Sequence, residues 1–229
     1  MHVPDGFFDV PVSLAGGAIA VAGVAVALRG SRRELDERTA LLAGLTAAFV
    51  FGAQMLNFPV AGGTSGHLLG GALAAILVGP WTGLLCVSVV LAVQALLFAD
   101  GGLSALGVNI VLMAIVTVIV GYGVFRGLLR VLPKTRPSAV AASFAGALVS
   151  VPASAATFVL LYAVGGTADV PLGTVLSAML GVHVLIGIGE ALITAVTVSS
   201  VLAVRPDLVY GARDLARPLE LRTSPVETS

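Results

Sequence analysis

Long apolar runs constrain the fold of this chain more than any other feature of its sequence. A helix that crosses the hydrocarbon core of a bilayer needs about 20 mostly apolar residues. Six runs of this kind are present, at residues 10–28, 39–56, 81–99, 105–125, 138–164 and 172–204. Charged residues make up only 10% of the chain, whereas soluble domains average about 25%. We therefore expect an all-α, polytopic membrane protein.

A further uncharged segment, residues 57–78, has a composition that one regular helix cannot accommodate. It begins with the residues NFPVAGGTSG, whose proline and glycines disfavour a helix. The helix expected to follow, from His67 to Val78, would be only about 18 Å long, which is too short to cross a bilayer. Non-helical backbone inside a membrane is tolerated where it is buried or lines a cavity. We therefore predict seven helical segments, with residues 57–67 lining an outward-facing cavity.

The basic residues predict the orientation of the chain. All twelve follow the first or the fifth helical segment or lie in the C-terminal tail: Arg29, Arg32, Arg33, Arg38, Arg126, Arg130, Lys134, Arg136, Arg205, Arg213, Arg217 and Arg222. With seven spans these regions share one side, which the positive-inside rule places in the cytoplasm. The N-terminus is then outside. We expect residues 1–204 to form one domain in the cell membrane and residues 205–229 to form a short, polar, solvated cytoplasmic tail.

The N-terminus carries the first candidate metal ligands. The first nine residues lack the positive region of a cleavable signal peptide, and a large residue at position 2 normally prevents removal of the initiator methionine. We therefore expect a free amine on Met1. This amine, the amide nitrogen of His2 and Nδ1 of His2 can chelate one metal in a five-membered and a six-membered ring. Planar nitrogen ligands suit Ni²⁺ and Cu²⁺ best, Co²⁺ less well, and Mg²⁺ or Ca²⁺ not at all.

His67 is the candidate fourth ligand, because the expected cavity and the N-terminus lie on the same face of the membrane. Asn57, Thr64 and Ser65 are candidates for holding the loop and orienting the imidazole of His67, as groups behind metal ligands do. The alternative for His67 stays open, since a lone histidine in a polar loop is more often a hydrogen-bonded structural residue. The residues 1–9 and the loop 57–67 together form the predicted metal site.

Other polar residues in the apolar segments allow two interpretations each. His183 and Glu190 lie seven positions apart and so share a face of the last helix. They serve either packing, through hydrogen bonds, or metal passage and coupling to a partner. Gln94, Asp100 and Asn109 flank an outer loop, where they serve either turn formation or a wall of the metal site.

The chain resembles the cobalt/nickel substrate-binding (S) components of energy-coupling-factor transporters, the CbiM/NikM family. The resemblance lies in MHVPDGFF, NFPVAGGTSGHLLGGALAAILVGPW, LLFADGGLSALGVNI and HVLIGIGEALIT, which span nearly the whole membrane portion in the expected order. It implies a seven-helix S component that binds Ni²⁺ or Co²⁺ through the Met1 amine, the backbone and side chain of His2, and His67. It also implies high-affinity import with a transmembrane coupling subunit and ATPase subunits, and in this family a small accessory membrane subunit can join them.

Two other functions remain as alternatives. Gly63-Thr64-Ser65-Gly66 has the G-x-S-G form of a rhomboid-type intramembrane serine protease, for which Ser65 would be the nucleophile and His183 a conceivable base. A stand-alone secondary metal carrier is the second, although such carriers usually place several carboxylates or histidines at mid-membrane. The sequence has no G-x-x-x-x-G-K-[ST] P-loop. We therefore expect a transporter subunit rather than an enzyme, with the metal as substrate, no prosthetic group, and no nucleic-acid partner.

Overall fold

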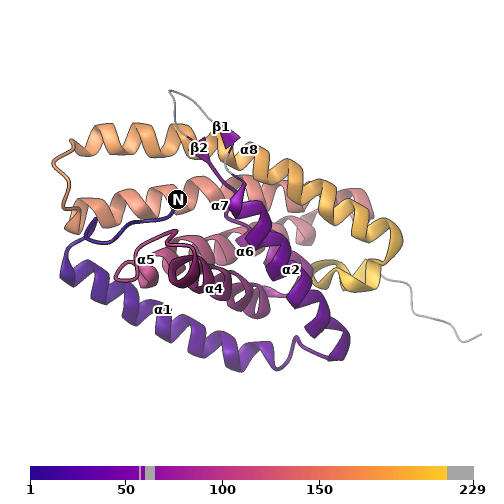
Figure 1. The fold of residues 1–229 in the computed structure, drawn as a ribbon. Coiled ribbons are helices and arrows are strands. Elements are labelled where there is room, and N and C mark those ends of the chain that lie inside the picture. The colour runs from indigo at the N-terminus through magenta and orange to yellow at the C-terminus, as the bar shows by residue number, and fades with distance from the viewer. Residues whose placement is uncertain (57, 60–64, 216–229) are drawn as a thin grey trace, which may run out of the picture.

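The chain forms a helical bundle (Figure 1). The computed structural model describes residues 1–56, 58–59 and 65–215. Its helices are α1 (Val10–Ser31), α2 (Glu37–Met55), α3 (Gly71–Val78), α4 (Pro80–Leu97), α5 (Leu106–Ile110), α6 (Thr117–Val131), α7 (Arg136–Gly165) and α8 (Leu172–Val204). A π-helical stretch, η1 (Val111–Val116), joins α5 to α6. Two short strands, β1 (Phe58–Pro59) and β2 (Ser65–Gly66), pair antiparallel in the loop before α3.

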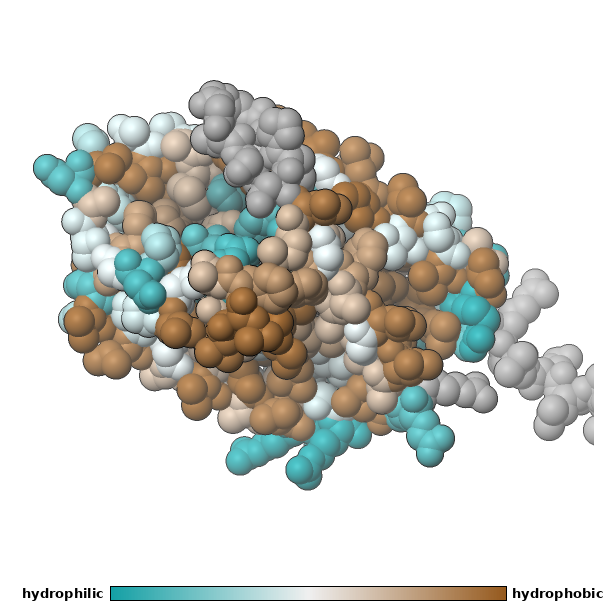
Figure 2. All heavy atoms as spheres, viewed as in Figure 1, coloured by the Kyte–Doolittle hydropathy of each residue, from teal (hydrophilic) through white to brown (hydrophobic). Residues whose placement is uncertain are grey.

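The prediction of an all-α membrane protein is confirmed. Within the described residues, five helices are long and apolar enough to cross a membrane: Val10–Ser31, Pro80–Leu97, Leu106–Val131, Arg136–Gly165 and Leu172–Val204. α2 contributes a shorter apolar stretch, Thr39–Met55. Apolar side chains cover most of the face drawn in Figure 2, and hydrophilic ones gather mainly toward its edges. The number of seven crossings and the orientation of the termini stay predictions.

The short helix α3 forms the centre of the bundle. All eight of its residues are buried, and it packs against α4 and α6. The helix begins at Gly71, four residues later than the His67 start that the sequence predicted. The chain turns into the helix at Gly70, whose φ of +81° is open to glycine. His67 therefore lies in the non-helical approach to α3, at the end of β2, rather than in the first turn of the helix.

Two buried carboxylates hold α3 and the helix that follows it. Glu190 of α8 accepts hydrogen bonds from the backbone N–H groups of Leu69 and Gly70, at 2.7 Å and 3.0 Å. Glu34, in the loop after α1, accepts from the N–H and hydroxyl of Thr82 at the start of α4, at 2.7 Å and 2.8 Å. A carboxylate at a helix N-terminus satisfies free N–H donors and interacts favourably with the helix dipole.

The segment after α8 differs from its predicted form. We expected a solvated tail from residue 205, but 3₁₀ helices at Pro206–Leu208 and Tyr210–Leu215 fold back onto the bundle. Val209 and Ala212 are buried there, and Tyr210 packs near Tyr122 of α6. The tail is mostly polar in composition, so the sequence did not indicate that these few apolar residues would be buried against the bundle. Residues 216–229 lie outside the described part of the chain.

Candidate metal centre

The N-terminal segment, residues 1–9, folds back into the bundle instead of extending away from α1. Figure 1 shows the segment running from the start of α1 back across the helices, and Val3 and Phe8 within it are buried. Asn109 of α5 fixes the segment with two hydrogen bonds: its Oδ1 accepts from the N–H of Val3 at 2.9 Å, and its Nδ2 donates to the carbonyl of Val3 at 3.2 Å. The N–H of Gly102 donates to the same carbonyl at 2.9 Å. Position 3 is therefore held from two sides, as in a short strand.

The outer half of the N-terminal segment has its own contacts. Asp5 accepts hydrogen bonds from the N–H and hydroxyl of Ser104, at 2.7 Å and 2.6 Å. Phe8 forms a β-bridge with Gly166, in the connection between α7 and α8. Phe7 packs against Phe158, with ring centroids 5.5 Å apart. These contacts to two separate loops hold the outer half of the segment against the bundle.

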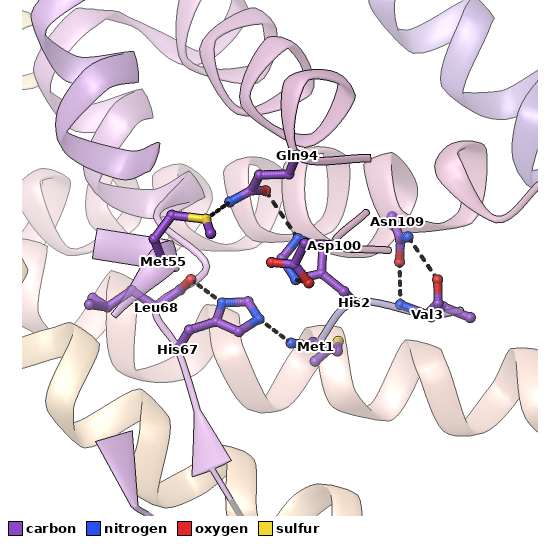
Figure 3. A network of polar contacts seen from close by, with 9 residues as sticks. All are labelled: Met1, His2, Val3, Met55, His67, Leu68, Gln94, Asp100 and Asn109. Carbon is purple, nitrogen blue, oxygen red and sulfur yellow. Dashed lines mark hydrogen bonds and ion pairs between the residues drawn. The ribbon is translucent and has the colours of Figure 1, made fainter. Parts of the chain in front are cut away.

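The amine of Met1 lies against the imidazole of His67. Its nitrogen is 2.5 Å from Nε2 of His67 (Figure 3). Nδ1 of His67 lies 2.8 Å from the carbonyl of Leu68 and must donate, because a carbonyl only accepts. Nε2 therefore presents its lone pair to the amine. Burial lowers the pKa of the Met1 amine to about 5, although the nearby charge of Asp100 opposes the shift.

The side chain of His2 lies next to that of His67. Its ring stacks on that of His67, with centroids 4.7 Å apart. Nε2 of His2 donates to Oε1 of Gln94 at 3.1 Å, which leaves a lone pair on Nδ1. Nδ1 lies 3.3 Å from a carboxylate oxygen of Asp100. Burial and the neighbouring Met1 amine lower the pKa of His2. Two acceptors face each other here, so the position between them favours a cation.

These distances suit a shared metal. Two nitrogens bound at right angles, each about 2 Å from one metal ion, lie about 2.8 Å apart. The 2.5 Å separation of the Met1 amine and Nε2 of His67 is close to that value. In the chelate expected from the sequence, the amine and His67 are adjacent corners of a square. The arrangement provides nitrogen donors, which favour late transition metals over Mg²⁺ or Ca²⁺.

The predicted supporting residues divide into three groups. Asn57 and Thr64 lie outside the described residues, and of Ser65 only its backbone, in β2, is described. Glu190 binds the backbone just after His67 and so fixes the approach to the metal site. His183 lies in α8 and bonds the carbonyl of Met179 at 2.7 Å, with no contact to Glu190 among the hydrogen bonds of the described residues.

Several contacts of the site were left open or missed by sequence reasoning. Gln94, Asp100 and Asn109 were equally compatible with turn formation, and the structure brings all three to the N-terminal segment. Ser154 of α7 was missed. Its hydroxyl donates to the carbonyl of Leu112 in η1 at 2.7 Å and lies 3.4 Å from the sulfur of Met1. A serine in an apolar helix was the only signal, and it does not identify a partner 153 positions away.

Comparisons with known proteins identify relatives named as metal transport proteins. The family model CbiM, described as cobalt uptake substrate-specific transmembrane region, matches residues 2–208. A protein of Haloquadratum walsbyi named as a metal transport protein is 42% identical over 211 residues, which cover 92% of this chain and 94% of that protein. A protein of Archaeoglobus fulgidus named as the fused nickel transport protein NikMN is 39% identical over 91% of this chain and 68% of its own length.

A solved structure also has this fold. The crystal structure of a truncated transition metal transporter aligns with a TM-score of 0.76 and 31% sequence identity. The alignment covers 89% of this chain and 99% of that one. The similarity therefore extends over most of the chain.

Proposed function

The chain belongs to the CbiM family, and on that premise we propose that it captures Ni²⁺ or Co²⁺ outside the cell and passes it inward as the substrate-binding membrane subunit of an importer. The family description names cobalt uptake, and a relative that is 39% identical is named for nickel transport. Both metals accept the nitrogen donors found at the N-terminus. The metal is the substrate, and no prosthetic group takes part in the proposal.

One observation carries the proposal: the Met1 amine lies 2.5 Å from Nε2 of His67. The proposed ligands are this amine, the amide nitrogen and Nδ1 of His2, and Nε2 of His67. Leu68 and Gln94 fix the tautomers of the two rings through hydrogen bonds. Such partners behind the ligands typically contribute about 10–100-fold to metal affinity. The burial of the amine favours its neutral, metal-binding form.

The membrane arrangement completes the proposal. Seven helical segments lie in the cell membrane, with the N-terminus outside and the C-terminus in the cytoplasm. The basic residues at the end of α1, the end of α6 and the start of α7 support this orientation. The N-terminal segment then faces the outside, where the metal arrives, and residues 1–9 close over the ion once it is bound.

In this proposal ATP hydrolysis for transport belongs to other subunits, because the sequence has no P-loop. We propose that a transmembrane coupling subunit and ATPase subunits of an energy-coupling-factor transporter reorient this chain, with a small accessory membrane subunit as a further partner. The protease alternative gains no support. Of its four-residue segment, only the backbone of Ser65 and Gly66 is described, and the comparisons match transport proteins.

Uptake of radioactive Ni²⁺ or Co²⁺ into proteoliposomes tests the proposal. We expect ATP-dependent uptake when this chain is reconstituted with coupling and ATPase subunits, and loss of that uptake in the His67→Ala variant. An exposed substitution, Glu37→Gln, provides the control. Uptake by this chain alone, without nucleotide, would instead support a secondary carrier. Full uptake in the His67→Ala variant would contradict the proposed ligand set.

A further inference from the structure

A cavity of about 300 Å³ lies beside the N-terminal segment, against α7 and α8. Met1 and His2 line one wall, Phe158 of α7 lines another, and Met179 and His183 of α8 line the wall opposite the segment. The other lining residues are apolar. The proposed metal centre therefore borders on a mostly apolar space, and a histidine that the centre does not use faces that space from another helix.

His183 is fixed in the tautomer that binds metals. Its Nδ1 lies 2.7 Å from the carbonyl of Met179 and must donate its proton there. Nε2 therefore carries a lone pair, and it has no hydrogen-bond partner among the described residues. The residue is only 5% exposed. A buried polar atom without a partner is costly, so such atoms call for an explanation.

The ring of His183 is prepared in the same way as that of His67. In both residues a backbone carbonyl holds the proton on Nδ1, and Nε2 is left as the donor. A neutral imidazole oriented by a carbonyl is a common form of metal ligand. The thioethers of Met1 and Met179 also belong to residues that line the cavity. Imidazole and thioether are donors for late transition metals, not for Mg²⁺ or Ca²⁺.

A purely structural role leaves Nε2 unexplained. The nearest acidic residue on the same helix face, Glu190, has both of its carboxylate oxygens engaged by the N–H groups of Leu69 and Gly70. It is not among the residues that line the cavity. The backbone bond from His183 to Met179 alone would be available to many side chains that lack a second nitrogen. The second nitrogen is the feature that requires a function.

We propose that His183 is a transit ligand, whose Nε2 holds the metal in this cavity while the ion moves to or from the Met1, His2 and His67 centre. This inference rests on the proposed function. A divalent ion without ligands is very unfavourable in an apolar cavity. Nε2 donates its lone pair as a nitrogen of the N-terminal segment withdraws, and the reverse exchange returns the ion. The metal–ligand bonds change, the amide nitrogen of His2 takes up a proton from water when it releases the ion and loses that proton when the ion returns, and no redox step occurs.

Rapid-mixing kinetics of Ni²⁺ binding test the proposal. A ligand used only in transit speeds entry and exit equally, so its loss changes both rate constants and leaves their ratio, the Kd, unchanged. We expect His183→Ala and His183→Phe to slow association and dissociation by about tenfold each, with Kd within about twofold of the parent protein. Val182→Ala, which alters the same cavity without removing a donor, should keep the parental rates.

The outcomes separate this inference from the proposed function. Parental rates in both His183 variants would overturn the transit role and leave the metal centre intact. A parent protein that binds no Ni²⁺ would overturn the proposed function, and the transit role with it. A large loss of equilibrium affinity in both variants, with the control unaffected, would make His183 a ligand of the resting site and would likewise overturn a role limited to transit.

A direct measurement of occupancy avoids dependence on the variants. Square-planar Ni²⁺ is diamagnetic, so Ni²⁺ that fills the N-terminal centre leaves NMR signals sharp. Excess Co²⁺, which is paramagnetic, should then broaden the ring nitrogen signals of His183 before those of distant residues. Sharp His183 signals in excess Co²⁺ would contradict the presence of a metal-accessible donor in the cavity.

Discussion

The main-chain nitrogen of Met1 lies 2.5 Å from Nε2 of His67, across 66 positions of sequence. The N-terminal segment thereby brings Met1 into contact with the approach to α3. The segment that delivers it is fixed at Val3 by Asn109, at Asp5 by Ser104 and at Phe8 by Gly166. The geometry of the proposed metal site therefore depends on how accurately these contacts place nine residues, and each contact can be tested separately.

The hydrogen bonds between Asn109 and the backbone of Val3 are the first of these contacts. Asn109→Ala removes both side-chain hydrogen bonds to the backbone of Val3 and leaves only the one from Gly102. We expect Ni²⁺ affinity to fall by about 10–100-fold, as it does when groups behind metal ligands are lost. Ser104→Ala, which removes a hydroxyl contact at the exposed end of the segment, is the matched control and should change affinity far less. Calorimetric titration measures the Ni²⁺ affinity of both variants. Equal affinities for the parent protein and Asn109→Ala would contradict the claim that the hydrogen bonds of Asn109 position the segment.

A substitution at Gly102 tests how closely this loop must approach the N-terminal segment. A Cβ at this position would lie 2.3 Å from the backbone nitrogen of Asp5, so Gly102→Ala must displace either the loop or the segment. We expect about a tenfold loss of Ni²⁺ affinity, because the displaced backbone carries metal ligands and their supports. Gly17→Ala on α1, where a Cβ meets nothing within 4 Å, should leave affinity unchanged. A normal affinity for Gly102→Ala would show that the loop moves without the segment.

Glu190 is expected to support the fold more than the chemistry. Glu190→Ala leaves two buried N–H groups, those of Leu69 and Gly70, without acceptors. Each such group costs about 1–3 kcal/mol, so the loss of stability for the two together should be about 2–6 kcal/mol. Glu190→Gln retains one acceptor and should lose less. Thermal unfolding in detergent measures this order, with the exposed Glu37→Gln as control. Equal melting temperatures for the parent and Glu190→Ala would contradict the assigned bonds.

The lowered pKa of the Met1 amine predicts a distinct pH dependence of metal binding. Burial lowers its pKa to about 5, so at neutral pH the amine is already neutral and competes with no proton. Only the amide proton of His2 must then be released, and log Kd should change by about one unit per pH unit between about pH 6 and pH 7.5. A free Met-His peptide, whose amine titrates near pH 8, should show a slope of about two. A slope of two in the protein would contradict a buried, neutral amine.

The apolar runs predicted most of the fold. A segment that crosses a bilayer must make its backbone hydrogen bonds internally, so each run was expected to form a helix. Two differences arose where tertiary contacts override composition. α3 begins at Gly71 instead of His67, since Glu190, more than a hundred positions away, binds the N–H groups of Leu69 and Gly70. Residues 206–215 of the predicted solvated tail pack onto the bundle, mainly against α3, and bury Val209 and Ala212. Neither long-range contact has a local signal in the sequence.

Part of the candidate site could be predicted from the sequence for chemical reasons. Three nitrogens at a Met-His start can close chelate rings of fixed size, so the proposal of these ligands follows from covalent structure. The surrounding residues do not. Gln94, Asp100 and Asn109 were each explained equally well by a turn, because the sequence does not reveal that the N-terminal segment folds back among them. Asn57 and Thr64 remain predictions, since both lie outside the described residues.

The most direct test of the central claim adds two residues before Met1. The extension moves the free amine away from His67 and converts the nitrogen of Met1 into an amide. Ni²⁺ is titrated into the extended protein, into the unmodified protein and into a control with two residues added at the C-terminus, and the visible absorbance of the bound metal is followed. We predict tight binding with a yellow, square-planar spectrum in the unmodified protein and the control, and loss of both in the N-terminally extended protein. An unchanged affinity and spectrum after N-terminal extension would contradict a metal site built on the Met1 amine.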